Sequence, residues 1–298
     1  MILETRHKTV IKAAGKEKMN QPADNNLNNI KAIAFDLDGV VYIGNTVIPG
    51  AVMTVQALRE KGFKIFFVTN NSGKKREYLA AKLTSMGIKA NVDDVFSSGY
   101  AAASLVMELS GSGDKVHVIG SSDFKEEIVN LGIEITQGCS CGLLVVGIDS
   151  GFNYEMLSAS LEILRGGATF IVCNRDRNFP IENGRYLPGC GPIVAAIEWA
   201  WGGVAHYDVG KPNTKLLEMI SLKYDLKPSE ILVVGDVIDS DIAMAKRFGA
   251  KSVLIPYDQQ KKLQNNSSGK DVKPDFILQK IEELIGMLSF VPAISQRQ

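Results

Sequence analysis

Short continuous apolar segments alternate with amphipathic segments from Lys31 onward, and this alternation constrains the fold more than any other feature of the sequence. In one amphipathic segment, Leu79, Leu83 and Met86 recur at helical spacing on one face, and Gly87 is placed to end the helix. Continuous apolar strands separated by helices indicate a parallel sheet that is covered on both faces. The sequence therefore predicts the α/β class. The expected strands are KAIAF (31–35), IFFVT (65–69), KVHVIG (115–120), GLLVVGI (142–148), ATFIVC (168–173) and ILVVG (231–235).

Polar residues follow three of these strands at the point where each strand ends. Asp36 and Asp38 follow the first strand, Thr69 and Asn70 end the second, and Asp236 follows the ILVVG strand. Ligands of open α/β sheets bind outside the carboxyl ends of the strands. If these strands are neighbours, carboxylates and small hydrogen-bond donors meet at one edge of the sheet.

The charges of such a site indicate its chemistry. Clustered carboxylates repel one another and need a bound cation, and their hard oxygen atoms suit magnesium. Lys211, in the segment Val-Gly-Lys-Pro-Asn, would add a second positive charge, so that the site could offset the charge of a phosphate group. Residues 36 and 38 point to the same side of a strand, so one carboxylate can attack phosphorus while the other transfers a proton. Gly39 lets the backbone turn sharply and approach the phosphate.

Each motif also has an ordinary interpretation. Asp-x-Asp-Gly occurs in turns and calcium loops, Thr-Asn-Asn-Ser can cap a helix, and the segment 236–241 can cap the helix that follows it. The functional interpretation depends on the conjunction of the motifs, each after an apolar strand. Asp149 also ends an apolar strand, but neither a second carboxylate nor a lysine motif accompanies it. We therefore leave Asp149 out of the predicted catalytic set.

The composition is balanced in charge and lacks membrane signals. Lysine plus arginine and aspartate plus glutamate number 33 each, so no net charge attracts nucleic acid or an anionic membrane. No apolar run approaches the ~20 residues that cross a bilayer, and residues 1–18 lack the apolar stretch of a secretory signal. We therefore expect a cytoplasmic protein with a small-molecule partner, no nucleic acid and no membrane. The four cysteines lack zinc-site spacing and are expected to be reduced packing thiols.

Three segments lack the periodicity of regular structure. Residues 1–28 indicate a flexible N-terminal tail rich in turn formers, within which Met19 is a candidate natural start. Residues 259–270 indicate an exposed loop, and residues 291–298 a C-terminal tail.

Taken in order, the motifs resemble those of the haloacid dehalogenase superfamily. The four motifs are matched by Phe-Asp-Leu-Asp-Gly-Val at 35–40, Thr69-Asn70, Lys211, and Gly235-Asp236 with Asp241. The resemblance implies a phosphoryl-transfer site with a nucleophile, a general acid/base, phosphate ligands and magnesium. The implied catalytic residues are Asp36 as nucleophile, Asp38 as acid/base, and Thr69 and Lys211 as phosphate ligands beside the backbone amide of Asn70. The implied magnesium ligands are Asp36, the Asp38 carbonyl and Asp236, with Asp241 in support.

Further segments are similar to the subfamily that contains NagD, p-nitrophenyl phosphatases, phosphoglycolate phosphatases and pyridoxal phosphatase. They are residues 38–42, 69–72, 146–149, and 174–176 through 188–191. Cys173 and Arg175 depart from the usual Thr-Asn-Pro-Asp form, and Val237, Ile238 and Ser240 depart mildly from the fourth motif. These departures leave the substrate preference open more than the chemistry.

The same resemblance implies a doubly wound, Rossmann-like parallel sheet with an inserted α/β cap. About 140 residues separate the second motif from the third, far more than a single crossover requires. We assign residues 29–99 and 206–290 to the core domain and residues 100–205 to the cap, which would exclude water and carry specificity. The predicted substrate-binding residues are Asn70 and Asn71 of the core and Asn174, Arg175 and Asp176 of the cap. A polar turn is the alternative for Arg175.

The predicted function is magnesium-dependent hydrolysis of a small phosphorylated metabolite through an aspartyl phosphate. The expected substrates are a sugar phosphate, phosphoglycolate or glycerol phosphate, with p-nitrophenyl phosphate as a surrogate. One alternative is phosphotransfer to another hydroxyl acceptor, and a second is a non-catalytic protein that binds a phosphorylated metabolite. The intact set of Asp36, Asp38, Lys211 and Asp236 favours catalysis over binding alone. A homodimer formed through the cap is a further expectation.

Overall fold

The computed structural model of the chain describes residues 27–111, 115–181, 184–256 and 272–288. Three sequence predictions therefore fall largely or wholly outside the described residues. They are the N-terminal tail up to residue 26 with the candidate start at Met19, the loop 259–270, and the C-terminal tail 291–298.

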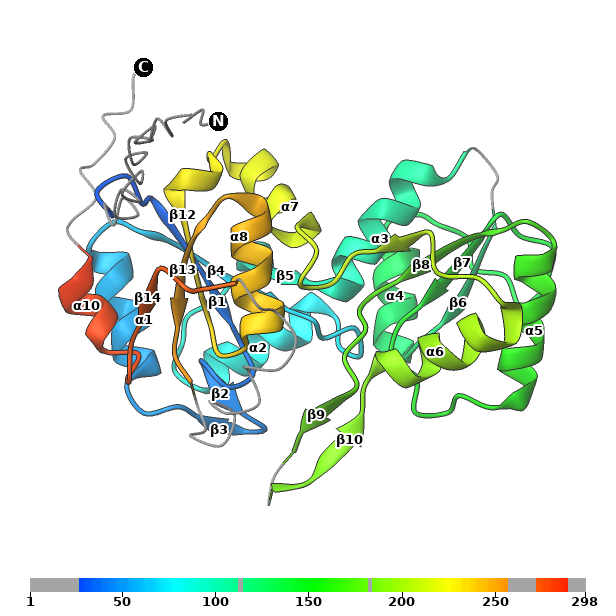
Figure 1. Ribbon diagram of the computed structural model, residues 1–298, viewed down its shortest axis with the longest axis horizontal. Coiled ribbons are helices and arrows are strands. Elements are labelled where there is room, and N and C mark those ends of the chain that lie inside the picture. Colours follow the sequence, from blue (N-terminus) through cyan, green and yellow to red (C-terminus); the bar gives the residue numbers. More distant parts are fainter. Residues whose placement is uncertain (1–26, 112–114, 182–183, 257–271, 289–298) are drawn as a thin grey trace, which may run out of the picture.

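A six-stranded parallel sheet forms the centre of one half of the molecule (Figure 1). β1 lies in its interior, between β4 on one side and β12 on the other. The strands, in spatial order, are β14 (Phe276–Ile277), β13 (Lys251–Leu254), β12 (Ile231–Gly235), β1 (Ala32–Asp36), β4 (Lys64–Thr69) and β5 (Val95–Ser97). The motifs that follow β1, β4 and β12 are therefore neighbours at the carboxyl ends of these strands.

Helices cover both faces of this core sheet, as the continuous apolar strands predict. Alternate residues of β1 divide between the faces, so Ile33 and Phe35 join one apolar cluster while Ala32 and Ala34 join the other. The first cluster includes residues of α1 (Ala51–Glu60), α2 (Arg76–Ser85) and α10 (Glu283–Met287), and the second includes α7 (Lys215–Tyr224) and α8 (Ala243–Phe248). The predicted doubly wound α/β class is confirmed.

A second parallel sheet of four strands is built from residues between β5 and β12 (Figure 1). Its spatial order is β11 (Tyr207–Asp208), β8 (Thr169–Val172), β7 (Leu143–Val146) and β6 (Val116–Ile119). Its helices are α3 (Ser98–Leu109), α4 (Ser122–Asn130), α5 (Tyr154–Arg165) and α6 (Cys190–Trp201). The pairing of β11 with β8 carries the second sheet to Asp208, just beyond the end predicted for the cap. The described residues also contain two antiparallel strand pairs, β2 (Tyr42–Ile43) with β3 (Thr46–Val47) and β9 (Asn178–Pro180) with β10 (Tyr186–Pro188).

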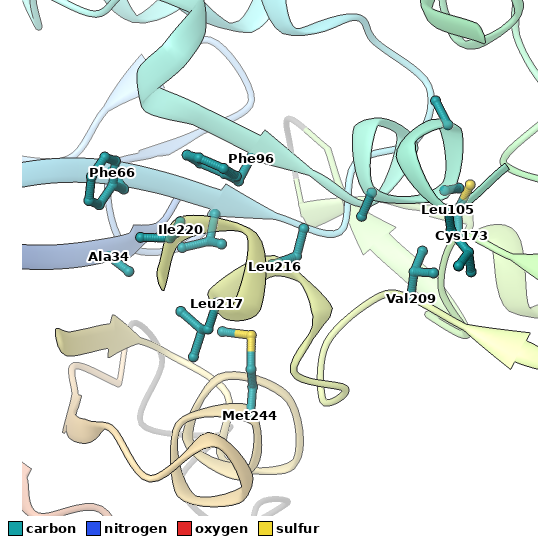
Figure 2. Close-up of a cluster of buried hydrophobic side chains, with 14 of the residues drawn as sticks. Ala34, Phe66, Phe96, Leu105, Cys173, Val209, Leu216, Leu217, Ile220 and Met244 are labelled. Atoms are coloured by element: carbon teal, nitrogen blue, oxygen red, sulfur yellow. The ribbon is translucent and has the colours of Figure 1, made fainter. Parts of the chain in front are cut away.

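One apolar cluster connects the two sheets. Figure 2 shows Phe66 and Phe96 of the core sheet near Ile220 of α7, with Leu105 of α3 and Val209 extending the cluster toward the second sheet. The alanine-rich face of α3 packs within the same cluster. The position of the second sheet relative to the core is therefore stabilised by buried apolar contacts as well as by polar ones.

The predicted strands are all present, and the predicted helix face of Leu79 and Leu83 is buried in α2. Gly87 adopts a φ of +87° immediately after the end of that helix, the left-handed conformation that glycine adopts most readily. The four cysteines are free thiols, and each packs against an apolar cluster, in agreement with the prediction. None of the helices in the described part of the chain is both long and apolar enough to cross a membrane.

Candidate active site

Asp36 lies at the C-terminal end of β1, in the interior of the core sheet, and its carboxylate contacts Lys211. Lys211 Nζ lies 2.6 Å from Asp36 Oδ1 and 2.7 Å from Asp241 Oδ1. All three residues are buried. The end of β1, the turn after β12 and the segment that follows β11 of the second sheet thus bring together side chains from the first, fourth and third motifs, although they are far apart in the sequence.

The fourth motif places two carboxylates at the end of β12. Asp236 directly follows the strand, and Asp241 lies in the helical turn Ile238–Ile242 that leads into α8. Asp241 Oδ2 accepts a hydrogen bond from the backbone N–H of Val237 at 3.1 Å, which fixes the carboxylate. A Cβ on Gly235 would lie 2.2 Å from Asp241 Cβ, so the strand can only approach Asp241 with glycine at this position.

The turn after β1 requires glycine for two reasons. Gly39 has a φ of +97°, and a Cβ there would lie 2.4 Å from Asp236 Oδ2. Asp38, which precedes it, is half-buried, and burial raises the pKa of its carboxyl group, while the positive charges of Lys82 and Lys211 oppose that change. A raised pKa suits a group that has to carry a proton before it donates one.

Lys82 is a neighbour of this turn that the sequence analysis does not identify. It lies on α2, and its ammonium group is 3.8 Å from the centre of the buried Tyr42 ring. Helical periodicity alone assigns such a lysine to the solvent-facing side of α2. The one indication in the sequence is that α2 directly follows the second motif, which places the helix near the site.

Burial and charge dominate the electrostatics of the cluster. Burial raises the pKa of Asp36 well above its usual value, Asp241 and Asp236 add to the increase, and Lys211 opposes it. Burial alone would lower the pKa of Lys211, but the charges of Asp241 and Asp36 outweigh it and raise that pKa. When all the groups are ionised, three carboxylates face one ammonium group and leave an excess of negative charge.

This donor set fits a divalent cation. Carboxylate oxygens of Asp36, Asp236 and Asp241 all lie within 4.8 Å of one another, and all three residues are buried. Hard oxygen donors that are held close together and carry excess negative charge are the ligands that magnesium prefers. The cluster contains the two predicted side-chain ligands, Asp36 and Asp236, and the predicted supporting residue Asp241.

The second motif forms a loop whose polar groups are already ordered. Thr69 is buried at the end of β4, and its Oγ1 accepts a hydrogen bond from the backbone N–H of Asn71 at 3.1 Å. The side chain of Asn71 accepts hydrogen bonds from the N–H groups of Gly73 and Lys74, so it stabilises the turn. A direct contact between this side chain and substrate stays a prediction.

The side chain of Asn70 connects two segments of the candidate site. Its Oδ1 accepts from the backbone N–H of Lys211 at 2.7 Å, and its Nδ2 donates to the backbone O of Lys211 at 3.2 Å. The same Nδ2 donates to Asp176 Oδ1 at 3.0 Å. Asn70 thus connects the second motif to the third and to the loop after β8.

The predicted cap residues divide into two groups. Asn174 and Asp176 reach the second-motif loop, where Asn174 Nδ2 donates to the backbone O of Asn70 at 2.7 Å. The guanidinium of Arg175 points elsewhere and pairs with both carboxylate oxygens of Glu198 and with Asp208. A contact of Arg175 with substrate stays a prediction.

Ser98 is a second polar residue that the sequence analysis does not identify. It is fully buried at the start of α3, and its Oγ donates to the backbone O of Asn70 at 2.7 Å. A pair of serines at the end of the short strand β5 is the available signal, but it follows the pattern of an ordinary helix start.

The family models match most of the core sequence. A model described as haloacid dehalogenase-like hydrolase matches residues 33–134, and a HAD-hydrolase-like model matches residues 208–284. The chain is 31% identical to a human glycerol-3-phosphate phosphatase, over 88% of this chain and 92% of that protein. It is 32% identical to an acid sugar phosphatase of Staphylococcus saprophyticus, over 87% of this chain and 98% of that protein.

Solved structures show the same similarity in three dimensions. A p-nitrophenyl phosphatase from Archaeoglobus fulgidus has a TM-score of 0.81 and 32% identity, covering 87% of this chain and 99% of that chain. NagD from Escherichia coli has a TM-score of 0.76 and 25% identity, covering 85% and 98%. The glycerol phosphate phosphatase Rv1692 from Mycobacterium tuberculosis, solved with magnesium, has a TM-score of 0.78 and 27% identity, covering 89% and 80%. With motifs, fold and relatives in agreement, the chain belongs to the haloacid dehalogenase-like hydrolases, with NagD and p-nitrophenyl phosphatases among its structural neighbours, and is a phosphatase.

Proposed function

We propose that this phosphatase hydrolyses small phosphate monoesters with magnesium, through an aspartyl phosphate formed on Asp36. The observation that carries the proposal is the buried contact of Asp36 with Lys211, beside Asp236 and Asp241. A carboxylate in this position can act as nucleophile, and the surrounding charges can stabilise a transferring phosphoryl group.

In the first step, a carboxylate oxygen of Asp36 attacks phosphorus, and the bond between phosphorus and the ester oxygen breaks. Asp38, protonated at the start, gives its proton to the leaving oxygen. The phosphoryl oxygens are held by the Lys211 ammonium group, the Thr69 hydroxyl and the backbone N–H of Asn70. In the second step, Asp38 takes a proton from water and the water oxygen attacks phosphorus. The bond between phosphorus and the Asp36 oxygen breaks, which releases inorganic phosphate and restores the Asp36 carboxylate.

Magnesium would be held by the carboxylates of Asp36 and Asp236 and by the Asp38 carbonyl, with Asp241 in support. When bound, it would offset negative charge on the phosphoryl group and on the carboxylates. The magnesium-bound structure of the mycobacterial relative supports this choice of metal. Lys211 stays protonated beside Asp36 because the neighbouring carboxylates raise its pKa.

The substrate class proposed here is a sugar phosphate, phosphoglycolate or glycerol phosphate. The names of the human and staphylococcal relatives support sugar and glycerol phosphates. We propose that residues 100–205 form a specificity cap on a core of residues 29–99 and 206–290. Association of two copies through that cap stays a prediction. Light scattering on the purified protein measures the number of copies.

The first test measures phosphate release from a panel of phosphate esters, with magnesium or with EDTA. We expect phosphate release by the wild type to require the metal. We expect Asp36→Asn to lower the rate of release by at least about 10³-fold, since no other carboxylate replaces the nucleophile. Asp149→Asn is the matched control, because Asp149 also follows a strand, β7, but its carboxylate accepts a hydrogen bond from Gly151 within a local turn. Added alcohol acceptors in the same assay separate hydrolysis from phosphotransfer.

Each outcome decides part of the proposal. Turnover that survives Asp36→Asn would contradict the assignment of the nucleophile. Full activity in EDTA after exhaustive dialysis would contradict the proposed requirement for magnesium. A phosphorylated acceptor as the main product would identify a phosphotransferase.

A further inference from the structure

Buried polar groups connect the second-motif loop to both segments through which the chain passes between the two sheets. The outgoing segment contributes Ser98 at the start of α3, and the returning segment contributes Lys211. Asn174, at the end of β8, completes the group. All three residues are at most 6% exposed. Water therefore cannot easily replace a hydrogen bond that is lost here, and the loss is costly.

The backbone carbonyl of Asn70 is the acceptor at the centre of this group. Ser98 Oγ and Asn174 Nδ2 each donate to it at 2.7 Å, so both of its lone pairs are used. The amide of Asn174 is fixed in orientation, because its Oδ1 accepts from the backbone N–H of Asp176 at 3.1 Å. Asn174 therefore presents a donor, and not an acceptor, to the catalytic loop.

The other end of the same peptide unit reaches Thr69. The N–H of Asn71, which shares that peptide unit with the Asn70 carbonyl, donates to Thr69 Oγ1 at 3.1 Å. Donors on the carbonyl polarise the peptide and strengthen its N–H as a donor. Because the Thr69 oxygen accepts here, its own hydroxyl proton is directed toward a different acceptor. In the proposed mechanism that acceptor is a phosphoryl oxygen.

Close packing fixes the spacing between the two loops. A Cβ on Gly210 would lie 2.4 Å from the carbonyl O of Cys173 and 2.7 Å from Asn174 Cβ. The returning segment and the end of β8 are therefore in direct contact, and Asn174 cannot shift without displacing the backbone beside Lys211.

We propose that Asn174 is a positioning residue for the phosphate site, and not a contact of the substrate's leaving group. It holds the peptide between Asn70 and Asn71, and through it the Thr69 hydroxyl, in the orientation that binds a phosphoryl oxygen. The phosphate site is then complete only while the end of β8 lies against the second-motif loop. This inference rests on the proposed function and assigns a role that differs from the substrate contact expected from the sequence.

The test compares kcat and KM for two substrates with different leaving groups, glycerol phosphate and p-nitrophenyl phosphate. A positioning residue acts on the phosphoryl group that both substrates share. We therefore expect Asn174→Ala to lower kcat/KM by about 10- to 100-fold, by the same factor for both substrates. Ser98→Ala, which removes the other donor with little change of shape, lowers kcat/KM for both substrates in the same way.

Asn153→Ala is the control for loss of an asparagine elsewhere beside the second sheet, on an exposed site. Asn153 caps α5 through hydrogen bonds to the N–H groups of Glu155 and Met156, away from the second-motif loop. We expect this variant to lose some stability but to keep the wild-type kcat/KM with both substrates.

A binding measurement makes the inference independent of turnover. Calorimetry with inorganic phosphate and magnesium is expected to show about tenfold weaker binding to Asn174→Ala than to the wild type. Unequal losses for the two substrates would assign Asn174 to the leaving group and overturn the inference. So would wild-type kcat/KM and phosphate affinity in both Asn174→Ala and Ser98→Ala. If the wild type is inactive but its phosphate affinity still depends on Asn174, the proposed hydrolysis is contradicted and the positioning role is supported.

Discussion

Asp36 and Asp38 are two residues apart, yet the structure gives them different surroundings. Asp36 is in direct contact with Lys211, whereas Asp38 is half-buried on the loop beyond the strand. Burial raises the pKa of both carboxyl groups, but only Asp36 is in the acidic cluster that fits a cation. The proposed division between a nucleophile and a proton carrier follows from this difference.

Asp38→Asn is expected to separate the two steps of hydrolysis. p-Nitrophenolate leaves without a proton, so the variant still transfers the phosphoryl group to Asp36, but it cannot activate water for the second step. We predict a rapid release of about one equivalent of p-nitrophenol per enzyme followed by turnover slowed by about 10²–10⁴-fold. Stopped-flow absorbance measures the burst.

Glycerol phosphate provides the comparison for that experiment. Its alkoxide leaving group needs the proton, so a quench experiment with Asp38→Asn should show no burst of glycerol. A wild-type steady rate, or slow release of p-nitrophenol without a burst, would contradict the acid/base role of Asp38.

The core motifs are predictable from the sequence because they lie directly after buried strands. Asp236 directly follows β12, and the parallel pairing of β12 with β1 brings it toward Asp36. Lys211 follows β11 of the second sheet and reaches Asp36 where the chain returns to the core. The hydrogen bonds of Asn174 and the ion pairs of Arg175 are not predictable in this way. They depend on how one loop packs against another, which no local periodicity encodes.

At the scale of elements, the edge of the core sheet is joined to α8 through Asp275, which precedes β14. Asp275 Oδ2 accepts from the backbone N–H of Ser252 at 2.9 Å, from its hydroxyl at 2.7 Å, and from Lys246 Nζ at 2.6 Å. The carboxylate thus connects β13, α8 and the start of β14. Burial alone would raise the pKa of Asp275, but these donors outweigh it and lower the pKa.

Asp275→Asn is expected to lower the free energy of unfolding at pH 7 by about 1.5–3 kcal/mol, since charged hydrogen bonds are lost from a half-buried site. The pKa of Asp275 is lower in the folded chain than in the unfolded chain. The stabilisation is therefore fully present above the unfolded value of about 4 and is lost as pH falls through the folded value. Urea unfolding of wild type and variant at several pH values measures the difference.

Asp93→Asn is the matched control, because Asp93 pairs with Lys223 at 2.6 Å on an exposed surface. We expect it to change stability by less than about 1 kcal/mol. Equal losses from the two variants, or a difference that persists unchanged in acid, would contradict the role given to Asp275.

Strand prediction succeeds and fails along this sheet for a physical reason. The interior strands β1 and β12 are buried on both faces, so each is a continuous apolar run. The outer pair of strands on one side, β13 and β14, has polar residues at or beside it: Ser252 lies in β13 and Asp275 precedes β14, and the two side chains hydrogen-bond to each other. The apolar runs at β13 and β14 are only three residues long, 253–255 and 276–278, and both strands are absent from the predicted strands.

At the scale of the whole molecule, α2 of the core and α4 beside the second sheet are joined by a partly buried ion pair. Arg76 Nε lies 2.7 Å from Glu127 Oε1, and Glu127 Oε2 accepts from the backbone N–H of Arg76 at 3.2 Å. The Arg76 guanidinium also lies 3.4 Å from the centre of the Tyr100 ring on α3. Three elements therefore meet at one arginine.

Glu127→Gln is expected to lower the free energy of unfolding by about 2–3 kcal/mol, because it leaves a partly buried guanidinium without its carboxylate. Glu126→Gln removes the next residue's charge, but Glu126 is half exposed and pairs with Lys75 on the surface. We expect that control to lose less than about 1 kcal/mol. Thermal and urea unfolding of the two variants make the comparison, and similar losses would contradict the importance of burial.

The long interval between the second and third motifs predicts an insertion, and the second sheet is built from residues within that interval. The contacts across the boundary are not predictable from spacing. Arg76 and Glu127 look like ordinary charged residues of two amphipathic helices. Only the packing of α2 against α4 removes them from water.

The position of β1 between β4 and β12 has a consequence for how the chain acquires its structure. Ala32 aligns with Lys64 on one side and with Ile231 on the other. Pairing with β4 is complete early in synthesis, whereas pairing with β12 has to wait until the whole second sheet has been made. Until then the interior strand of the finished sheet is an exposed apolar edge on the nascent chain. We expect this interval to be the one in which the chain is most prone to aggregate and most dependent on chaperones.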